Sequence, residues 1–226
     1  MKLRDGAAHF FVASLAAPVL SDDDAHHALR VLRLRTGEVV TVCDGEGSWL
    51  PATLGRDGAL TPVGAPVIEP VSRWRIGVAF APVKAGKPEV IVQKLTELGV
   101  DDIVPLDATR RAVARWDESR VGRQHERLAK VAREAAMQSR LTRLPVVHPV
   151  TALADVLSRG AALAEPGGDE IEVSDRLVAV GPEGGFDPSE VEGAPRLVSL
   201  GESILRSETA AIVAGALMAR ARRTAP

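Results

Sequence analysis

Residues Val178 to Phe186 read Val-Ala-Val-Gly-Pro-Glu-Gly-Gly-Phe and give the clearest indication of the fold. Its apolar start predicts a buried strand that passes directly into a turn with two adjacent glycines and then into a capped helix at 187–190. Glycine lets the backbone approach a ligand closely or adopt positive φ, and α/β sheets bind ligands at the carboxyl ends of their strands. A tight turn without a ligand explains the same spacing equally well. The spacing of glycine and lysine fits neither a P-loop nor a dinucleotide fingerprint.

Residues 197–211, one strand later, show the same order of a strand, a short loop and a helix. A strand is expected to end at Leu200 and Gly201, a short loop then carries Ile204, Leu205 and Arg206, and a last helix follows. Ser207 is expected to cap that helix, with Glu208 in its first turn. Two consecutive strand-end loops predict one shared small-molecule site, although an arginine in this place could equally form a surface ion pair.

Strand-like and helix-like segments alternate from residue 73 to the end of the chain. Strands are expected at 75–83, 102–106, 176–180 and 196–200, and helices at 88–98, about 117–140 and 207–223. This alternation predicts an α/β domain with a mostly parallel sheet.

Residues 1–72 have a different pattern. Ser21 and the three aspartates after it predict a capped helix over 25–34, and short strands at 38–43, 48–54 and 59–63 are separated by turns that contain glycine. Regularly spaced short strands favour a small β-barrel. A proline-containing stretch from Pro62 to Pro70 marks the boundary, so the expected domains are 1–72 and 73–226.

Composition excludes several classes of protein. The chain has 226 residues, of which 46% are hydrophobic and 26% charged, as in ordinary globular domains. One cysteine rules out an internal disulfide, and the five histidines lack metal-ligand spacing, so no metal site is predicted. No apolar run approaches the roughly 20 residues that span a bilayer, and Asp5 and His9 disfavour a signal peptide at 7–20. A soluble, cytoplasmic protein is expected.

The formal net charge is −2, yet residues 110–143 contain ten basic and four acidic residues. A local basic stripe can bind phosphate, and it can equally be the solvated face of a helix.

Several motifs together carry a resemblance to a known family. Residues 181–185 and the pattern Leu200-Gly201-x-x-Ile204-Leu205-Arg206-x-Glu208-Thr209-Ala210 resemble the cofactor end of the SPOUT RNA methyltransferases. More narrowly, the chain resembles the RsmE family, which methylates N3 of one uracil in 16S ribosomal RNA. Further stretches similar to this family lie in the expected order at 9–12, 27–37, 93–100 and 134–139. The resemblance covers nearly the whole chain.

The resemblance implies a fold and a cofactor. It implies a PUA-like β-barrel that binds RNA over 1–72 and a SPOUT methyltransferase domain over 73–226, whose C-terminal segment forms a trefoil knot. It implies a homodimer with S-adenosylmethionine held in the knot loops. The cofactor-binding residues carried over are Gly181, Glu183, Gly184, Gly185, Leu200, Gly201, Ile204 and Leu205.

The resemblance also suggests residues for RNA and for catalysis. The expected RNA contacts are Arg30, Arg33 and Arg35 in the first domain and Arg111, Arg115 and Arg140 in the second; a solvated surface is the alternative for the first three. Methyl transfer to N3 needs the imide proton removed and negative charge stabilised. Arg206 is the candidate for stabilising the charge, and Glu208 or Glu183 for accepting the proton.

Two other functions stay open from the sequence. The same fold could methylate another RNA target, such as a tRNA base or a ribose 2′-hydroxyl. It could also serve as a non-catalytic RNA-binding factor in ribosome assembly. The substrate expected from the resemblance is 16S rRNA within the small ribosomal subunit, with no membrane partner.

Overall fold

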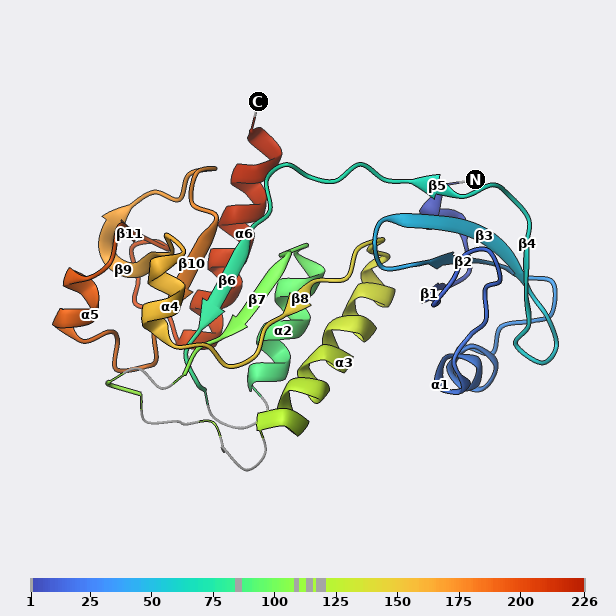
Figure 1. The fold of residues 1–226 in the computed structure, drawn as a ribbon, viewed down its shortest axis with the longest axis horizontal. Coiled ribbons are helices and arrows are strands. Elements are labelled where there is room, and N and C mark those ends of the chain that lie inside the picture. Colours follow the sequence, from blue (N-terminus) through green and yellow to red (C-terminus); the bar gives the residue numbers. More distant parts are fainter. Residues whose placement is uncertain (1, 84–86, 108–109, 113–115, 117–120, 226) are drawn as a thin grey trace. The chain divides into compact units, whose positions relative to one another are not determined.

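The computed structural model describes residues 2–83, 87–107, 110–112, 116 and 121–225, and the chain forms two compact units. The first unit comprises Met1–Ser72 and Arg133–Leu144, and the second comprises Arg73–Ala132 and Pro145–Pro226. Figure 1 shows the elements of each unit. The return of 133–144 to the first unit differs from the expected division, which assigned all residues after 72 to the second domain.

The first unit contains a five-stranded sheet. Its strands are β1 (His9–Phe11), β2 (Val39–Cys43), β3 (Ser48–Leu54), β4 (Leu60–Pro62) and β5 (Val67–Ile68). They lie in the order β1-β2-β3-β4, with β5 also paired to β3, and β1 is parallel to β2 whereas the other pairs are antiparallel. The three strands expected at 38–43, 48–54 and 59–63 are confirmed as β2, β3 and β4.

Three short helical segments accompany this sheet: η1 (Leu3–Asp5), α1 (Asp22–His26) and η2 (His27–Val31). The Ser21 hydroxyl caps α1 as expected, because it accepts a hydrogen bond from the Asp24 N–H at 3.1 Å. The helix expected to continue regularly to residue 34 instead widens into the π-helical turn η2, and Arg33 then adopts a φ of 55°.

Polar groups are buried in the first unit as well as apolar ones. His9 lies 2.8 Å from the Thr41 hydroxyl and 3.0 Å from the Leu141 carbonyl. Burial lowers the pKa of His9 to about 4, so its imidazole is neutral near pH 7. Residue 141 belongs to the returning segment 133–144, which therefore forms part of the core of this unit.

The second unit is built on a six-stranded, entirely parallel sheet in the order β11-β9-β10-β6-β7-β8. The strands are β6 (Gly77–Phe80), β7 (Asp102–Pro105), β8 (Val146–Val147), β9 (Ala162–Asp169), β10 (Leu177–Val180) and β11 (Leu197–Val198). The helices are α2 (Lys87–Glu97), α3 (Val121–Ser139), α4 (Leu153–Ser158), α5 (Pro188–Glu192) and α6 (Ser207–Thr224). The expected parallel α/β sheet is confirmed.

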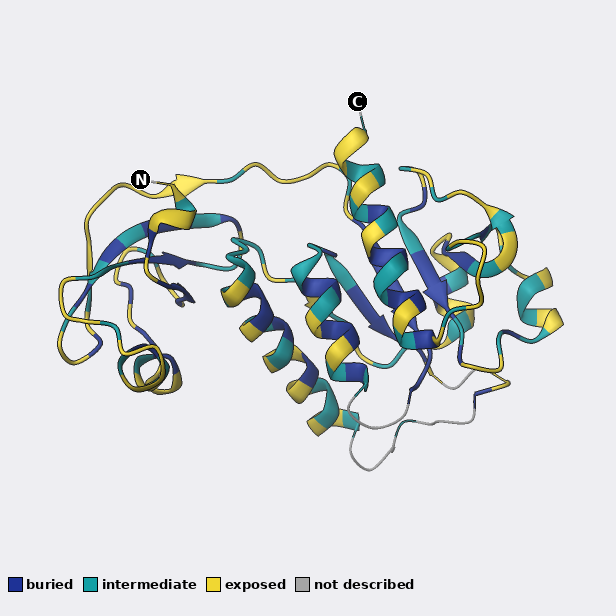
Figure 2. Cartoon of the chain, turned by 180° about the vertical axis from the view of Figure 1, so that it is seen from behind, coloured by how far each residue is buried: buried dark blue, intermediate teal, exposed yellow. Residues whose placement is uncertain are grey.

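Side-chain alternation divides this sheet between two hydrophobic cores. Val78 and Phe80 of β6 pack with α2, α6 and the part of α3 that belongs to this unit, whereas Ala79 packs on the opposite face with α4 and Phe186. Strand β10 divides in the same way, with Ala179 on the second face. Figure 2 shows these central strands buried and the outward faces of the helices exposed.

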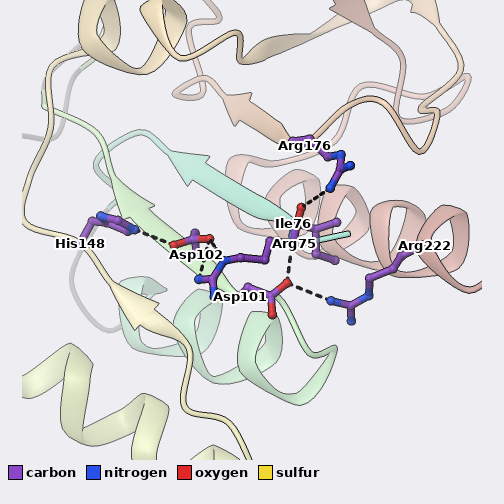
Figure 3. Close-up of polar contacts among 7 residues, drawn as sticks. All are labelled: Arg75, Ile76, Asp101, Asp102, His148, Arg176 and Arg222. Atoms are coloured by element: carbon purple, nitrogen blue, oxygen red, sulfur yellow. Dashed lines mark hydrogen bonds and ion pairs between the residues drawn. The ribbon is translucent and has the colours of Figure 1, made fainter. Parts of the chain in front are cut away.

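The edge of the sheet where β6, β7 and β10 begin, called here the amino edge, is held by charged side chains (Figure 3). Asp101 accepts hydrogen bonds from the Ile76 N–H and from the Arg222 guanidinium, both at 2.9 Å. Arg222 also donates to the Gly99 carbonyl at 2.9 Å. Asp101 thus joins the start of β6 to the C-terminal end of α6.

The neighbouring aspartate binds two further partners at the same edge. Asp102 pairs with Arg75 at 3.0 Å and with His148, the residue after β8, at 2.9 Å. Arg176, the residue before β10, donates to the Arg75 carbonyl at 3.4 Å. Strands β6, β7, β8 and β10 are therefore linked at this edge by side-chain contacts in addition to the backbone ladder.

Among the helices of the described residues, none combines the length and the apolarity that a membrane span requires.

Candidate functional site

The loops singled out in the sequence lie at the opposite edge of the parallel sheet, called here the carboxyl edge. Loop 181–187 follows β10, and loop 199–206 follows β11, so both leave the sheet at the ends of parallel strands. The two strands flank β9, which places them about 10 Å apart at ordinary strand spacing. This distance suits one small molecule held from two sides.

Glycine is required at different positions of these loops for different structural reasons. Gly185 has a φ of 71° and Gly201 a φ of 135°, conformations that residues with a side chain rarely adopt, and a Cβ at either would meet open space. A Cβ on Gly184 would instead lie 3.1 Å from the Arg111 carbonyl oxygen, and one on Gly181 would lie 3.2 Å from the Phe186 ring. The first pair is needed for backbone conformation and the second pair for close packing.

The apolar residues of loop 199–206 are arranged unequally. Leu200 and Leu205 are half-buried against the core that contains α2 and α6, whereas Ile204 is 91% exposed. A large aliphatic side chain in this position is available to cover an apolar group of a ligand. Glu183, in the other loop, is also exposed.

The start of α6 differs from expectation at one residue. Arg206, not Ser207, is the N-cap: its backbone is extended, and its carbonyl accepts the first helical hydrogen bond, from the Ala210 N–H at 2.8 Å. Ser207 is the first helical residue and is 4% exposed, and its hydroxyl has no hydrogen-bond partner among the described residues. The Arg206 side chain is exposed, and Glu208 lies in the first turn as expected.

A lysine that the sequence did not single out contacts this helix start. The Lys87 ammonium, on the first residue of α2, lies 2.7 Å from one carboxylate oxygen of Glu208. The hydrogen bond from Lys87 holds the pKa of Glu208 below its usual range, with a smaller contribution from the charge of Arg206. Nothing in the local sequence pairs residues 87 and 208, because the contact depends on α2 packing against α6.

The loop after β7 also reaches the glycine turn. Arg110 and Arg111 each lie 3.9 Å from the carboxylate of Asp187, the N-cap of α5, and the Arg110 N–H bonds to Glu190 at 3.2 Å. Since Gly184 packs on the Arg111 carbonyl, an expected RNA contact and an expected cofactor loop are neighbours. Arg115, another expected RNA contact, lies outside the described residues.

The expected RNA contacts in the first unit are exposed and close together in sequence. Arg30 belongs to η2, and Arg33 and Arg35 follow it. Val31 and Leu32, between them, are exposed as well. This short segment therefore presents cationic and apolar side chains together, a combination suited to phosphate and base contacts.

Part of the basic stripe at 110–143 is used within the first unit. Arg133 forms an ion pair with Asp24 at 2.6 Å, and Arg143 donates to the Glu69 carbonyl at 2.8 Å. Arg140, expected to contact RNA, donates to the carbonyls of Leu3 at 3.2 Å and Gly6 at 2.7 Å. These three arginines therefore make structural contacts within the first unit, whether or not they also contact RNA.

No group of three or more His, Cys, Asp or Glu side chains suited to a metal ion occurs in the part of the chain that the structure describes.

The family comparisons cover both units. Residues 70–219 match a family described as an RNA methyltransferase domain, and residues 20–60 match a family described as an RNA methyltransferase PUA domain. The chain is 32% identical over 232 residues to the ribosomal RNA small subunit methyltransferase E of Mycobacterium bovis. The matched region covers 91% of this chain and 88% of the relative.

Solved structures give the same result. A probable rRNA-methyltransferase from Porphyromonas gingivalis is 30% identical, with a TM-score of 0.76 over 96% of this chain and 98% of that one. A ribosomal RNA small subunit methyltransferase E from Neisseria gonorrhoeae, bound to S-adenosyl methionine, is 26% identical, with a TM-score of 0.79 over 93% of this chain and 96% of that one.

Proposed function

Because the chain belongs to the RNA methyltransferase family that includes ribosomal RNA small subunit methyltransferase E, we propose that it methylates 16S ribosomal RNA with S-adenosylmethionine, at N3 of a uridine. The observation that carries this proposal is the pair of glycine-containing loops at the carboxyl edge, one of which exposes Ile204. A family match alone would not say which edge of the sheet binds the cofactor.

The cofactor-binding residues proposed are those of the two loops: Gly181, Glu183, Gly184, Gly185, Leu200, Gly201, Ile204 and Leu205. The fit rests on three features of these residues: positive φ at Gly185, the close approach of Gly184 to Arg111, and the exposed aliphatic side chain of Ile204. S-adenosylmethionine supplies an electrophilic methyl group when bound. The loops themselves hold the ligand mainly through backbone groups, which glycine leaves accessible.

Arg206 is proposed to stabilise the uracil as it loses its N3 proton. Its guanidinium is exposed at the start of α6, beside the cofactor loop, and carries five donors and a permanent charge. A donor set aimed at developing negative charge lowers the barrier more than it strengthens ground-state binding. N3 lies on the Watson–Crick edge, so the target uridine must be unpaired when it reacts.

The remaining features of the proposal follow the resemblance. They are an RNA-binding PUA-like barrel over 1–72, a SPOUT methyltransferase domain over 73–226 with a trefoil knot, a homodimer, and a cytoplasmic location. The parallel sheet and the PUA family match at 20–60 support the domain assignment. Exposed Arg30, Arg33 and Arg35 support RNA contact by the first domain, and exposed Arg111 supports RNA contact beside the cofactor loop.

Product analysis tests this function. Small ribosomal subunits lacking the modification are incubated with the protein and isotope-labelled S-adenosylmethionine, and the rRNA is digested to nucleosides for mass spectrometry. We expect labelled 3-methyluridine from 16S rRNA. A labelled 2′-O-methyl nucleoside, or label only in added tRNA, would move the protein to another target. No label in any RNA would favour a non-catalytic binding factor.

A further inference from the structure

The Lys87–Glu208 contact joins two segments of the carboxyl edge that are distant in sequence. Lys87 begins α2, the helix that follows β6, and Glu208 is the second residue of α6, which follows the loop after β11. The two charged atoms lie 2.7 Å apart, and the side chains are 34% and 19% exposed. The pair therefore ties the first turn of α6 to the start of the neighbouring helix.

The same helix is anchored at its other end. Arg222 binds Asp101 and the Gly99 carbonyl at the amino edge, as described above. Fourteen residues separate Glu208 from Arg222, about 21 Å along a helix. Helix α6 packs into the core through Ala211, Ala214 and Met218 and has a charged contact near each end. The contact at Glu208 lies two residues from the N-cap, Arg206.

Two polar atoms beside the Lys87–Glu208 contact are buried. The second carboxylate oxygen of Glu208 is buried without a hydrogen-bond partner among the described residues, and so is the Ser207 hydroxyl beside it.

We propose that Lys87 and Glu208 form a positioning pair for methyl transfer: Lys87 holds Glu208, Glu208 fixes the first turn of α6, and Arg206 is thereby presented to the uracil. This inference rests on the proposed function. Glu208 stays an ionised anchor, and the N3 proton passes instead to Glu183, the other acceptor expected from the sequence, which is exposed in the loop after β10. The lowered pKa agrees with this role, because a carboxylate bound to an ammonium is a weaker base than a free one.

The test compares Lys87→Met, Glu208→Gln and the double variant with the wild type. Turnover, KM for small subunits, the Kd for S-adenosylmethionine and the pH profile of kcat are measured for each. We expect both single variants to lose turnover by a similar factor of about 10 to 100, the cost of a slight misplacement of a catalytic group. The double variant should be no worse than the single ones, because both substitutions break one contact.

Three controls separate positioning from a general loss of stability. Lys94→Met removes the other described Lys–Glu pair of α2, the 2.9 Å contact with Glu97, and should leave kcat unchanged. Lys87→Arg keeps a cation near Glu208 and should recover turnover to within about threefold of the wild type. Cofactor affinity and the acid limb of the pH profile should stay the same in Lys87→Met.

Two results would overturn the positioning pair. One is wild-type kcat in Lys87→Met. The other is a loss in Glu208→Gln at least tenfold larger than in Lys87→Met, with disappearance of the acid limb, which is the behaviour of a proton acceptor. If the wild type transfers no methyl group to any RNA, the proposed function fails instead, so the two failures are distinguishable.

Discussion

The two edges of the parallel sheet in the second unit differ in their contacts: charged side chains link the elements at one edge, whereas glycine-containing loops form the other. At the amino edge, Asp101 and Asp102 bind four partners from the starts of strands, the residue after β8 and the end of α6 (Figure 3). At the carboxyl edge, two loops contain glycines with positive φ, a large aliphatic side chain is exposed, and two buried polar atoms have no partner among the described residues. The amino edge is arranged for stability, and the carboxyl edge is the one that we propose for the cofactor.

This difference explains how one helix can serve both purposes. Helix α6 ends in the paired charges of the amino edge and begins at the loop of the carboxyl edge. Arg222 fixes its C-terminal end, and Ala211, Ala214 and Met218 pack its middle into the core, so the position of the helix does not depend on its first turn alone. Substitutions at the two edges should therefore affect different measurements.

The largest effect is expected for Arg206→Ala at the carboxyl edge. Loss of a donor aimed at developing charge should lower kcat by about 100-fold or more, with the Kd for S-adenosylmethionine within about threefold of the wild type. Steady-state methylation and calorimetric titration measure the two quantities. An equal loss in both would assign Arg206 to cofactor binding instead.

A matched pair of glycines tests whether the conformation of the glycine turn matters for the ligand. Gly185 and Gly160 have φ values of 71° and 82°, and a Cβ on either would meet open space. Alanine at each should cost a similar amount of stability, about 1–2 kcal/mol. Only Gly185→Ala should weaken binding of S-adenosylmethionine, by about tenfold if roughly 1.4 kcal/mol of ligand contact is lost. Equal affinities in the two variants would count against this loop as the cofactor site.

At the amino edge, Asp101→Asn should reduce stability without affecting the ligand. The change removes the negative charge of the carboxylate that accepts hydrogen bonds from Arg222 and the Ile76 N–H. The free energy of unfolding should fall by about 1.5 kcal/mol, and Tm by about 3–6 °C. Thermal unfolding and cofactor titration provide the comparison. A large fall in cofactor affinity at unchanged Tm would mean that the two edges are not separate in function.

The smallest effect expected is on the acid stability of the carboxyl edge. Because the folded-state pKa of Glu208 is lowered, its ion pair contributes stability above the unfolded pKa of about 4.5, and that contribution is lost as pH falls through the folded pKa. Glu208→Gln should therefore lose less stability than the wild type between pH 5 and the acid transition. Parallel Tm curves for the two proteins over this range would contradict the assignment.

Much of the second unit could be predicted from the sequence, because its strands are short apolar runs and its helices have clear periodicity. Strands β6, β7, β10 and β11 and helices α2 and α6 lie where the pattern placed them, and Gly99 ends α2 with a φ of 74°. Strand β9 was missed. Its sequence contains Pro166, Gly167 and Gly168, residues that normally argue against a strand, and its pairing with β11 is irregular.

The contacts of the site were less predictable than its loops. The two glycine loops carry their own local signal, since a φ of 71° at Gly185 and of 135° at Gly201 favours glycine. Lys87 carries none, because its partner is 121 residues away and the contact exists only once α2 and α6 pack together. The roles of Arg133 and Arg140 were equally hidden, because an arginine that binds a distant carboxylate or carbonyl has the same sequence pattern as one facing solvent.

Thermal unfolding of the wild type with S-adenosylmethionine, with ATP and NAD as controls, tests most directly whether the protein binds this cofactor. At about 100 times its Kd, a ligand that binds only the folded state adds about 2.7 kcal/mol, or roughly 5–11 °C for a chain of this size. A cofactor site at the carboxyl edge predicts such a rise with S-adenosylmethionine and none with either control. An unchanged Tm at millimolar S-adenosylmethionine would contradict a cofactor site at the carboxyl edge.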